Sequence, residues 1–375
     1  MSTSRRSFLA GGLALPAASA LPGLDAPKTP PVAFRTLGRT GLKVSAVGMG
    51  CMITSDPSVI QRAADLGINY FDTARDYQSG NNERMVGAAL KGRRDKVLIV
   101  TKSAAATGRK ALAELDTSLR ELGTGHVDIW HLHSKDQPAD ITDDLREAQL
   151  AAKKAGKIRF AGVSTHTPNA IQAEVLKNGH FDVVLSVYNF MVGAGADAFL
   201  AAMQKAGVGV IAMKVMAGGM KAPDAPARAK RVMQRPGAAL AALKWVLSHP
   251  AVATTIPSMT DHDQVDENIA AMASAFNGAD GKVLEARAGE IRDTYCRMCN
   301  ACSGTCSQGL PVREVLRSVM YAEGYGQFAL GREHFAQLPE PLRQVRCGDC
   351  QGCSVECPNG VAVARRVSLA QAWFA

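Results

Sequence analysis

The strongest constraint on the fold is one stretch in which short apolar runs alternate with helical patterns. The apolar runs are Asn69–Asp72, Val97–Thr101 and Val127–Leu132, and each ends at or just before a polar residue. Helical patterns at Glu83–Leu90 and Arg109–Leu122 separate them. Strands that alternate with helices at this spacing predict a parallel sheet.

Four polar residues follow three successive strands of this stretch: Asp72, Tyr77, Lys102 and His133. Catalytic residues of a closed parallel barrel lie at the carboxyl ends of its strands, so we expect these four to converge on one rim. The Lys102 ammonium is expected to lower the pKa of the Tyr77 phenol from about 10. Asp72 would hold Lys102, and His133 would orient a carbonyl. Such a set can protonate a carbonyl oxygen while hydride reaches the carbon, or run the reverse.

The same alternation continues along the chain and predicts an α/β fold, a (β/α)8 barrel. Further strands are expected at Ser45–Met49, Arg159–Val163, Val183–Val187, Val208–Met213 and Val252–Ile256. Further helices are expected at Pro57–Leu66, Asp143–Ala155, Asn169–Asn178, Ala196–Ala206, Pro236–Ser248 and Gln264–Ala275. A hairpin at Phe34–Val44 would close the barrel floor. The glycines and prolines of Met216–Ala229 indicate a loop, which we expect to be a mobile lid.

Several motifs occur in a fixed order between Phe34 and Met272. They read FRTLGRTGLKVSAVGMGC, GINYFDTARDY, VTKS, VDIWHLHS, GKIRFAGVSTH and ALKWVLSHPAVATTIPSM. In these motifs and their order the chain resembles the aldo-keto reductase family. The resemblance implies a (β/α)8 barrel, an NAD(P) cofactor and a small carbonyl or alcohol substrate. It also implies a catalytic tetrad, which carries over as Asp72, Tyr77, Lys102 and His133.

The resemblance further implies positions for the cofactor, and this chain departs from several of them. The residues at the expected contact positions are Gly50, Cys51, Asp72, Ser164, Thr165, Met213, Ser258, Gln264 and Asn268. Thr165 stands where an Asn is usual, Leu185 where a Gln is usual, and Met213 where an aromatic ring is common. Ser258 and Gln264 replace the Lys and Arg that often grip the 2′-phosphate of NADP. The preference between NAD and NADP therefore stays open.

Eight of the nine cysteines lie in the last 80 residues, in two runs with the spacing C-x2-C-x2-C-x3-C. They are Cys296, Cys299, Cys302, Cys306, Cys347, Cys350, Cys353 and Cys357. This is the bacterial ferredoxin pattern, and it predicts two [4Fe–4S] clusters with the fourth cysteine of each run serving the other cluster. Zinc sites usually split into two separated pairs, and cysteines this close together are poor disulfide partners. Both alternatives fit the repeat less well.

These patterns divide the chain into three parts. Residues 1–31 are expected to be a signal and linker, residues 32–290 the barrel, and residues 291–375 a small, α-rich, ferredoxin-like domain with a helix at Val312–Ala322. We expect Asn277–Tyr295 to be a linker between the last two. A ferredoxin-like module joined to an aldo-keto reductase barrel is a known arrangement, and this chain resembles that branch.

The first residues resemble a twin-arginine export signal. Arg5 and Arg6 precede a weakly apolar stretch that ends at Ala18-Ser19-Ala20. The stretch is too short to span a membrane. We therefore expect export, for example to the periplasm, of a protein already folded with its clusters. The net charge is +9, but the basic residues are dispersed and predict no nucleic-acid partner.

Two functions of different classes follow. The first is an exported oxidoreductase that interconverts a carbonyl and an alcohol, with the clusters passing electrons to or from a redox partner protein. The second is an electron-transfer or scaffold protein whose barrel is catalytically silent. The complete tetrad favours the first, and the altered cofactor positions favour the second.

Overall fold

The computed structural model describes residues 30–218, 237–347, 350 and 352–375, except the side chains of residues 193–194. The expected export signal lies outside these ranges, and so does most of the expected lid at Met216–Ala229.

Eight parallel strands form one sheet in chain order, from β3 to β10. They are β3 (Met49–Gly50), β4 (Tyr70–Asp72), β5 (Leu98–Ser103), β6 (Val127–Leu132), β7 (Ile158–Thr165), β8 (Val183–Val187), β9 (Gly209–Met213) and β10 (Val252–Thr255). Parallel bridges from Val47 to Thr255 and from Gly50 to Ser258 join the two ends. The sheet is thus a closed barrel, as the sequence predicted.

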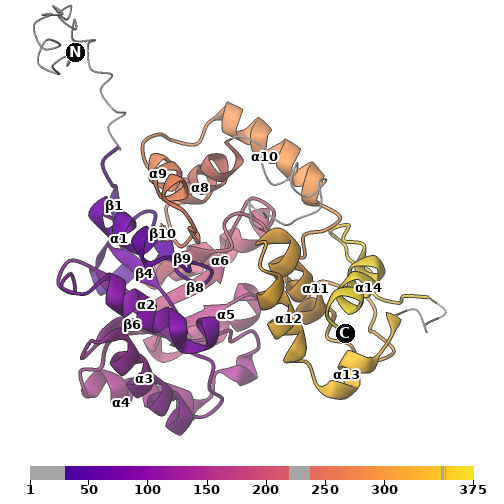
Figure 1. The fold of residues 1–375 in the computed structure, drawn as a ribbon, viewed down its shortest axis with the longest axis horizontal. Coiled ribbons are helices and arrows are strands. Elements are labelled where there is room, and N and C mark those ends of the chain that lie inside the picture. Colours follow the sequence, from indigo (N-terminus) through magenta and orange to yellow (C-terminus); the bar gives the residue numbers. More distant parts are fainter. Residues whose placement is uncertain (1–29, 219–236, 348–349, 351) are drawn as a thin grey trace, which may run out of the picture.

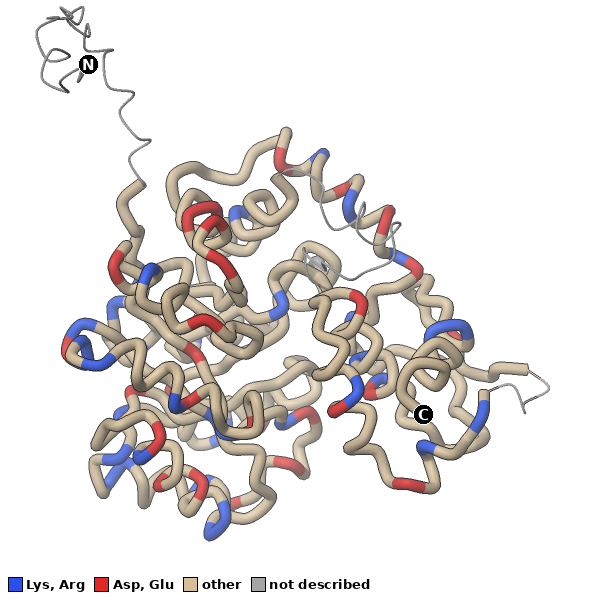
Figure 2. The backbone as a smooth tube through the Cα atoms, viewed as in Figure 1, with Lys and Arg blue, Asp and Glu red and all other residues tan. Residues whose placement is uncertain are grey.

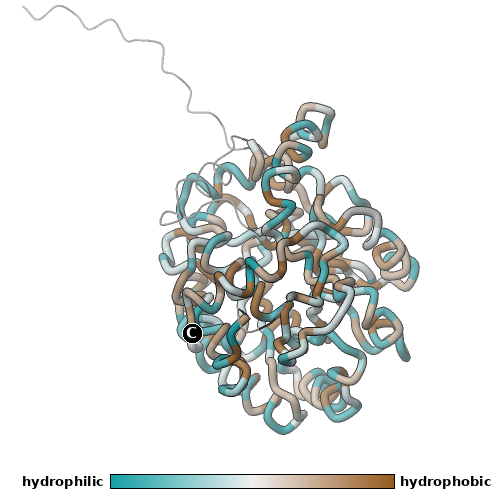
Figure 3. The backbone as a smooth tube through the Cα atoms, turned by 90° about the vertical axis from the view of Figure 1, so that its right-hand side faces the viewer, coloured by the Kyte–Doolittle hydropathy of each residue, from teal (hydrophilic) through white to brown (hydrophobic). Residues whose placement is uncertain are grey.

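Helices follow the strands and cover the outside of the barrel (Figure 1). They are α1 (Pro57–Asp65), α2 (Asn81–Ala89), α3 (Gly108–Leu122), α4 (Asp143–Lys154), α5 (Pro168–Leu176), α6 (Asp197–Lys205), α8 (Ala238–Ser248) and α9 (His262–Ala270). Side chains along a strand alternate between the two faces of the sheet. Accordingly, Phe71 and Ile99 pack under the helices, whereas Tyr70, Leu98 and Val100 fill the barrel interior. Apolar segments therefore run through the middle of the molecule (Figure 3).

An antiparallel hairpin closes the barrel floor, as expected. It consists of β1 (Phe34–Thr36) and β2 (Lys43–Ser45), joined through the short 3-10 helix Gly38–Thr40. The buried side chain of Leu37 lies so close to Gly209 that a Cβ there would approach it to 2.7 Å. The strand expected at Ser45–Met49 differs at its ends, because Ser45 pairs with Phe34 in the hairpin and β3 extends to Gly50, whereas Val47 and Met49 do pair within the barrel.

The segment expected to be a linker is instead the helix α10 (Gly278–Ile291). Asn277 and Asp280 form a reciprocal capping box that satisfies the backbone N–H groups at its start. An ion pair of 3.3 Å between Lys244 and Asp280 fixes α10 against α8. A helix packed against α8 therefore connects the barrel to the C-terminal helices.

The C-terminal helices form a second compact layer beside the barrel, drawn in gold and yellow in Figure 1. They are α11 (Val312–Val319), a π-helical turn (Met320–Gly324), α12 (Phe328–Ala336), α13 (Glu340–Gln344) and α14 (Val363–Phe374). They have an apolar core of their own, which includes Val315, Phe335 and Val367.

Charged residues of both signs are distributed over both layers (Figure 2). Of the helices in the described ranges, none is both long enough and apolar enough to cross a lipid bilayer.

Candidate active site

Lys102 lies at the centre of the predicted tetrad. Its Nζ donates hydrogen bonds to Asp72 Oδ1 and, over 2.7 Å, to the carbonyl oxygen of Thr73. The same Nζ lies 3.5 Å from the hydroxyl of Tyr77. Asp72 ends β4 and Lys102 lies near the end of β5, which explains why neighbouring strands bring them together. Both side chains are buried, so the ammonium and the carboxylate depend on each other for charge balance.

A strained turn presents Tyr77 to this pair. Gln78 and Ser79, which follow it, adopt positive φ angles of 51° and 53°. Such conformations cost a non-glycine residue about 1–3 kcal/mol each and persist where the surroundings enforce them. Here Gln78 Nε2 donates to the carbonyl oxygens of Met52, over 3.2 Å, and Thr54, over 2.8 Å. The turn is therefore tied to the neighbouring loop after β3.

The net shift in the pKa of Tyr77 is opposite to the lowering that Lys102 was expected to cause. Burial raises the pKa of Tyr77 well above its ordinary value, and the negative charges of Asp72 and Asp76 add to the rise. The sequence motif revealed the lysine but not the burial of Tyr77, which is the largest cause of the rise in its pKa. Tyr77 is consequently protonated at neutral pH and suited to donate a proton.

His133 completes the tetrad from the loop after β6. Its ring lies edge-on to that of Tyr77, with 5.7 Å between centroids. His133 Nδ1 lies 3.3 Å from Asp76 Oδ1. Although burial opposes it, the nearby His133 lowers the pKa of Asp76, which therefore stays ionised. Sequence reasoning missed Asp76, and its place one residue before Tyr77 is the signal that could have indicated it.

The C-terminal layer covers this rim. The hydroxyl groups of Tyr321 and Tyr325 lie near enough to Tyr77 to add to the rise in its pKa. Tyr321 belongs to the π-helical turn and Tyr325 follows it, and such turns are frequent at functional sites. Gly324 approaches the loop after β9 so closely that a Cβ would lie 1.9 Å from the carbonyl oxygen of Gly218. The catalytic rim is thus bounded by both parts of the chain.

Asp136 joins the two layers. Its carboxylate accepts hydrogen bonds from Thr165 Oγ1 over 3.2 Å and from the backbone N–H of His166 over 2.7 Å. Arg313 and Arg317 of α11 lie 3.4 and 3.7 Å from the same carboxylate. Thr165 was expected to contact the cofactor. Its hydroxyl is instead hydrogen-bonded to Asp136, which is ion-paired to the C-terminal layer.

Some of the other residues at expected cofactor positions lie at the end of the barrel that carries the tetrad, and others lie in the apolar core. Gly50 lies at the rim, where its Cβ would come within 2.6 Å of the Ile256 carbonyl oxygen, so only glycine fits. Ser258 forms a backbone bridge with Gly50. Ser164 Oγ accepts a hydrogen bond of 2.8 Å from the backbone N–H of Ser134. Leu185 is buried inside the barrel.

Four of the expected cofactor positions have side chains that are buried, half-buried or bonded within the protein. The side chain of Cys51 is wholly buried in the outer core, so it presents no surface to a cofactor. Asn268 is likewise buried, because it lies on the inner face of α9. Asp261 caps α9 and accepts hydrogen bonds from the backbone N–H and from the side-chain Nε2 of Gln264, over 2.8 and 2.6 Å. Met213 is half-buried at the end of β9, where it packs between the barrel interior and the C-terminal layer.

The two cysteine runs lie side by side. Ser303 and Glu356 exchange backbone hydrogen bonds of 3.0 and 3.1 Å, which form a bridge between the runs. Gly304 makes the close approach feasible, since a Cβ there would lie 1.8 Å from the Ser354 carbonyl oxygen. Asn359, after the second run, donates a hydrogen bond of 3.6 Å to Cys299 Sγ in the first.

The thiols influence one another across the runs. Burial and the nearby thiols of Cys302, Cys299 and Cys357 together raise the pKa of Cys296 to about 11. Burial also raises the pKa of Cys347, with further effects from Cys353, Cys350 and Cys306. The first cysteine of each run is thus surrounded by two thiols of the same run and by the last thiol of the other run. In the described ranges, no three His, Cys, Asp or Glu side chains converge as the ligands of a single metal ion would.

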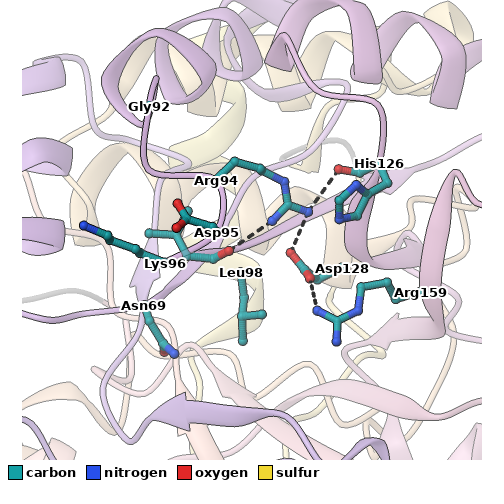
Figure 4. A pocket seen from close by; sticks show the side chains of 10 residues that line it. Asn69, Gly92, Arg94, Asp95, Lys96, Leu98, His126, Asp128 and Arg159 are labelled. Atoms are coloured by element: carbon teal, nitrogen blue, oxygen red, sulfur yellow. Dashed lines mark hydrogen bonds and ion pairs between the residues drawn. The ribbon is translucent and has the colours of Figure 1, made fainter.

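A cavity of about 590 Å³ lies at the opposite end of the barrel from the tetrad (Figure 4). Arg94 and Arg159 line it and lie 2.9 and 2.6 Å from the buried carboxylate of Asp128. Asp128 also accepts a hydrogen bond of 2.9 Å from the backbone N–H of Ile99. This network secures the first residues of β5 and β6, and the amino-terminal face of such a barrel serves stability.

Comparisons with known proteins agree with this geometry. The model of the aldo/keto reductase family matches residues 55–286. L-galactose dehydrogenase from Arabidopsis thaliana is 30% identical over 285 residues, which are 64% of this chain and 88% of that protein. The uncharacterized oxidoreductase YqkF from Bacillus subtilis is 28% identical over 278 residues, 63% of this chain and 90% of that protein. The holo form of aldo-keto reductase AKR11C1 from Bacillus halodurans superimposes with a TM-score of 0.59 at 28% identity, covering 68% of this chain and 96% of that one.

Proposed function

The chain belongs to the aldo/keto reductase family and is an NAD(P)-dependent oxidoreductase, and on that premise we propose that Tyr77 is its proton donor and acceptor in interconverting a carbonyl and an alcohol. The observation that carries the proposal is the position of the Tyr77 hydroxyl beside the buried Lys102–Asp72 pair. A protonated phenol next to a fixed ammonium can release its proton because the resulting phenolate is stabilised at once.

In the reducing direction, His133 orients the carbonyl oxygen by a hydrogen bond. Tyr77 gives its proton to that oxygen, and a reduced nicotinamide, when bound at the rim, would supply the hydride to the carbonyl carbon. The π electrons of the carbonyl take the proton, so the product is an alcohol, and Lys102 balances the Tyr77 phenolate. Oxidation of an alcohol runs through the same residues in reverse. Gly50, Ser164, Thr165 and Ser258 are the rim residues that would hold the cofactor.

The similarity to L-galactose dehydrogenase favours a sugar or a related hydroxy-carbonyl compound as substrate. The test uses full-length protein with NADH and NADPH deuterated at C4 and a panel of aldehydes and sugars. Deuterium at the carbinol carbon of the product is the expected result. Absence of deuterium from the product with both cofactors would support the alternative, an electron-transfer protein with a catalytically silent barrel. The hydrogen bond from Thr165 to Asp136 favours that alternative, because it occupies an expected cofactor contact.

We further propose that the cysteines hold two [4Fe–4S] clusters, one in each of the two neighbouring sets. One set is Cys296, Cys299, Cys302 and Cys357, and the other is Cys347, Cys350, Cys353 and Cys306. In such a cluster each thiolate would bind a different iron atom. The four thiols therefore need not converge on one point, as the ligands of a single metal ion must. The exchange of the fourth cysteine between the sets is the arrangement of two-cluster ferredoxins and supports the proposal.

The clusters would connect the barrel site to a redox partner protein. Each would carry one electron, so that two together match the two electrons of one hydride. The contact of α11 and the π-helical turn with the catalytic rim supports this route. Anaerobic addition of substrate to protein with bound cofactor should bleach the visible absorbance of the clusters. Clusters that stay oxidised would show that the barrel site does not pass electrons to them.

Export through the twin-arginine route is the last part of the proposal. It rests on Arg5, Arg6 and the small residues Ala18-Ser19-Ala20. The route carries folded proteins, which would allow cofactor and clusters to be inserted first.

A further inference from the structure

The ammonium group of Lys214 lies over two aromatic rings, and no ion pair to a carboxylate is found for it among the described residues. Lys214 directly follows β9 and adopts a positive φ angle of 56°, a strained conformation for a lysine. Its Nζ lies 5.3 Å and 5.7 Å from the ring centroids of Tyr321 and Tyr325. The side chain is half-buried, so its charge is partly withheld from water.

The carboxylates nearest to Lys214 already have other partners. Glu314 lies 3.0 Å from Arg313 and 3.3 Å from Arg317, and the same two guanidinium groups lie 3.4 and 3.7 Å from Asp136. Two negative charges are thus balanced by two positive ones. Among the residues with a defined position, Lys214 therefore adds a positive charge, beyond those that Glu314 and Asp136 balance, to this contact between the barrel and the C-terminal layer.

A second donor beside Lys214 also lacks a partner. The guanidinium Nε of Arg317 is buried, and in the part of the chain that the structure defines it makes no hydrogen bond. Buried donors are almost always bonded, so an unbonded one requires an explanation. His166, on the barrel side, cannot supply a charge, because burial lowers its pKa to about 3.

We propose that Lys214, together with Arg317, binds a carboxylate or phosphate group of the carbonyl substrate under a roof formed by Tyr321 and Tyr325. The inference rests on the proposed function and names its substrate class. An anion at this position would restore a charge partner to Lys214 and an acceptor to Arg317. Tyr321 and Tyr325 also lie near Tyr77, so one small molecule could present its anionic group here and its carbonyl to the tetrad.

The state of Lys214 predicts a pH dependence. Burial and the charge of Arg317 together lower its pKa to about 7, although Asp136 and Glu314 oppose the change. Burial keeps Tyr321 and Tyr325 neutral by raising their pKa values. The ammonium is present below this pKa and lost above it. Anion binding should therefore weaken as the pH rises from 7.

The test measures binding of two unreactive probes, malonate and sulfate, to the full-length protein by calorimetry. Malonate stands for a carboxylate and sulfate for a phosphate. Lys214→Met should weaken binding of the preferred probe about tenfold, the loss expected for one charge-assisted hydrogen bond. The matched control is Lys205→Met, which removes an exposed cation at the end of α6 and should leave binding as in the wild type. Malonate binding to the wild type should also weaken above pH 7, and this dependence should vanish in Lys214→Met.

Titration with NADH distinguishes the substrate from the cofactor. An unchanged NADH affinity in Lys214→Met, with weakened probe binding, supports a substrate subsite. A parallel loss of NADH affinity would assign Lys214 to the cofactor pyrophosphate and overturn the proposal, as would probe binding equal to that of the wild type. Because these measurements need no turnover, failure of every carbonyl to react would contradict the proposed function and leave the binding result standing.

Discussion

The guanidinium of Arg313 lies 3.4 Å from the carboxylate of Asp136, so a helix of the C-terminal layer is ion-paired to the catalytic rim. Arg317 adds a second, buried cation to the same carboxylate at 3.7 Å. Two segments almost 180 residues apart in sequence therefore share one charge network. The iron–sulfur and reductase parts of our proposal meet at this network.

Asp136→Asn should destabilise the protein by about 3 kcal/mol, because it removes one of the two carboxylates that balance Arg313 and the buried Arg317 and leaves Glu314 alone to do so. Urea denaturation of the full-length protein measures the change in the free energy of unfolding. The control is Asp266→Asn, which breaks the exposed pair with Arg62 and should cost less than about 1 kcal/mol. Equal losses of unfolding free energy in the two variants would show that the Asp136 network stabilises the protein no more than an exposed ion pair does.

Acid should weaken the same junction. Although burial opposes it, His334, Arg317 and Arg313 lower the pKa of Glu314 from 4.5 to about 2. Because the folded pKa lies below the unfolded one, this carboxylate stabilises the protein fully above pH 4.5 and progressively less as the pH falls towards 2. The unfolding temperature should drop over that range.

Glu314→Gln should remove part of this dependence, whereas Glu333→Gln, at an exposed position of α12, should retain it. A Glu314→Gln variant with the pH profile of the wild type would refute the assignment.

Cys357→Ser should remove the same cluster as Cys296→Ser, although the two residues lie in different runs. The wild type should contain about eight iron and eight sulfide per chain, and each variant about four. The surviving cluster should have the same electron paramagnetic resonance spectrum in both variants. Different spectra in the two variants would mean that each run binds its own cluster, and zinc in place of iron would reject the clusters altogether.

Arg5→Lys combined with Arg6→Lys should leave the protein in the cytoplasm, because the export route reads the arginine pair. Cell fractionation and immunoblotting measure the distribution. Arg109→Lys with Arg120→Lys, on the exposed face of α3, is the control and should be exported normally. Normal export of the first variant would remove the targeting proposal.

The barrel and the convergence of the tetrad were predictable because both depend on local signals. Apolar periodicity gives the strands, and residues at strand ends such as Asp72 and Lys102 must meet at one rim. Helix α10 escaped prediction because few of its residues are buried, among them Leu284 and Ile291, so its apolar stripe is weak.

The junction itself could not be derived from the sequence. The contacts of Lys214 with Tyr321 and Tyr325 join segments more than 100 residues apart and follow no periodic pattern. The sign of the shift in the pKa of Tyr77 was missed for a related reason. That shift depends on burial and on distant tyrosines, which no local motif reveals.

The central claim is that Tyr77 donates and accepts the proton during carbonyl–alcohol interconversion. Its most direct test is the pre-steady-state rate of hydride transfer in Tyr77→Phe, with folding and iron content verified to be unchanged. The control is Tyr70→Phe, which removes a buried hydroxyl that has no hydrogen-bond partner in the described structure. We predict a loss of at least about a hundredfold in Tyr77→Phe and a rate close to that of the wild type in Tyr70→Phe. Hydride transfer at the wild-type rate in Tyr77→Phe would contradict the account.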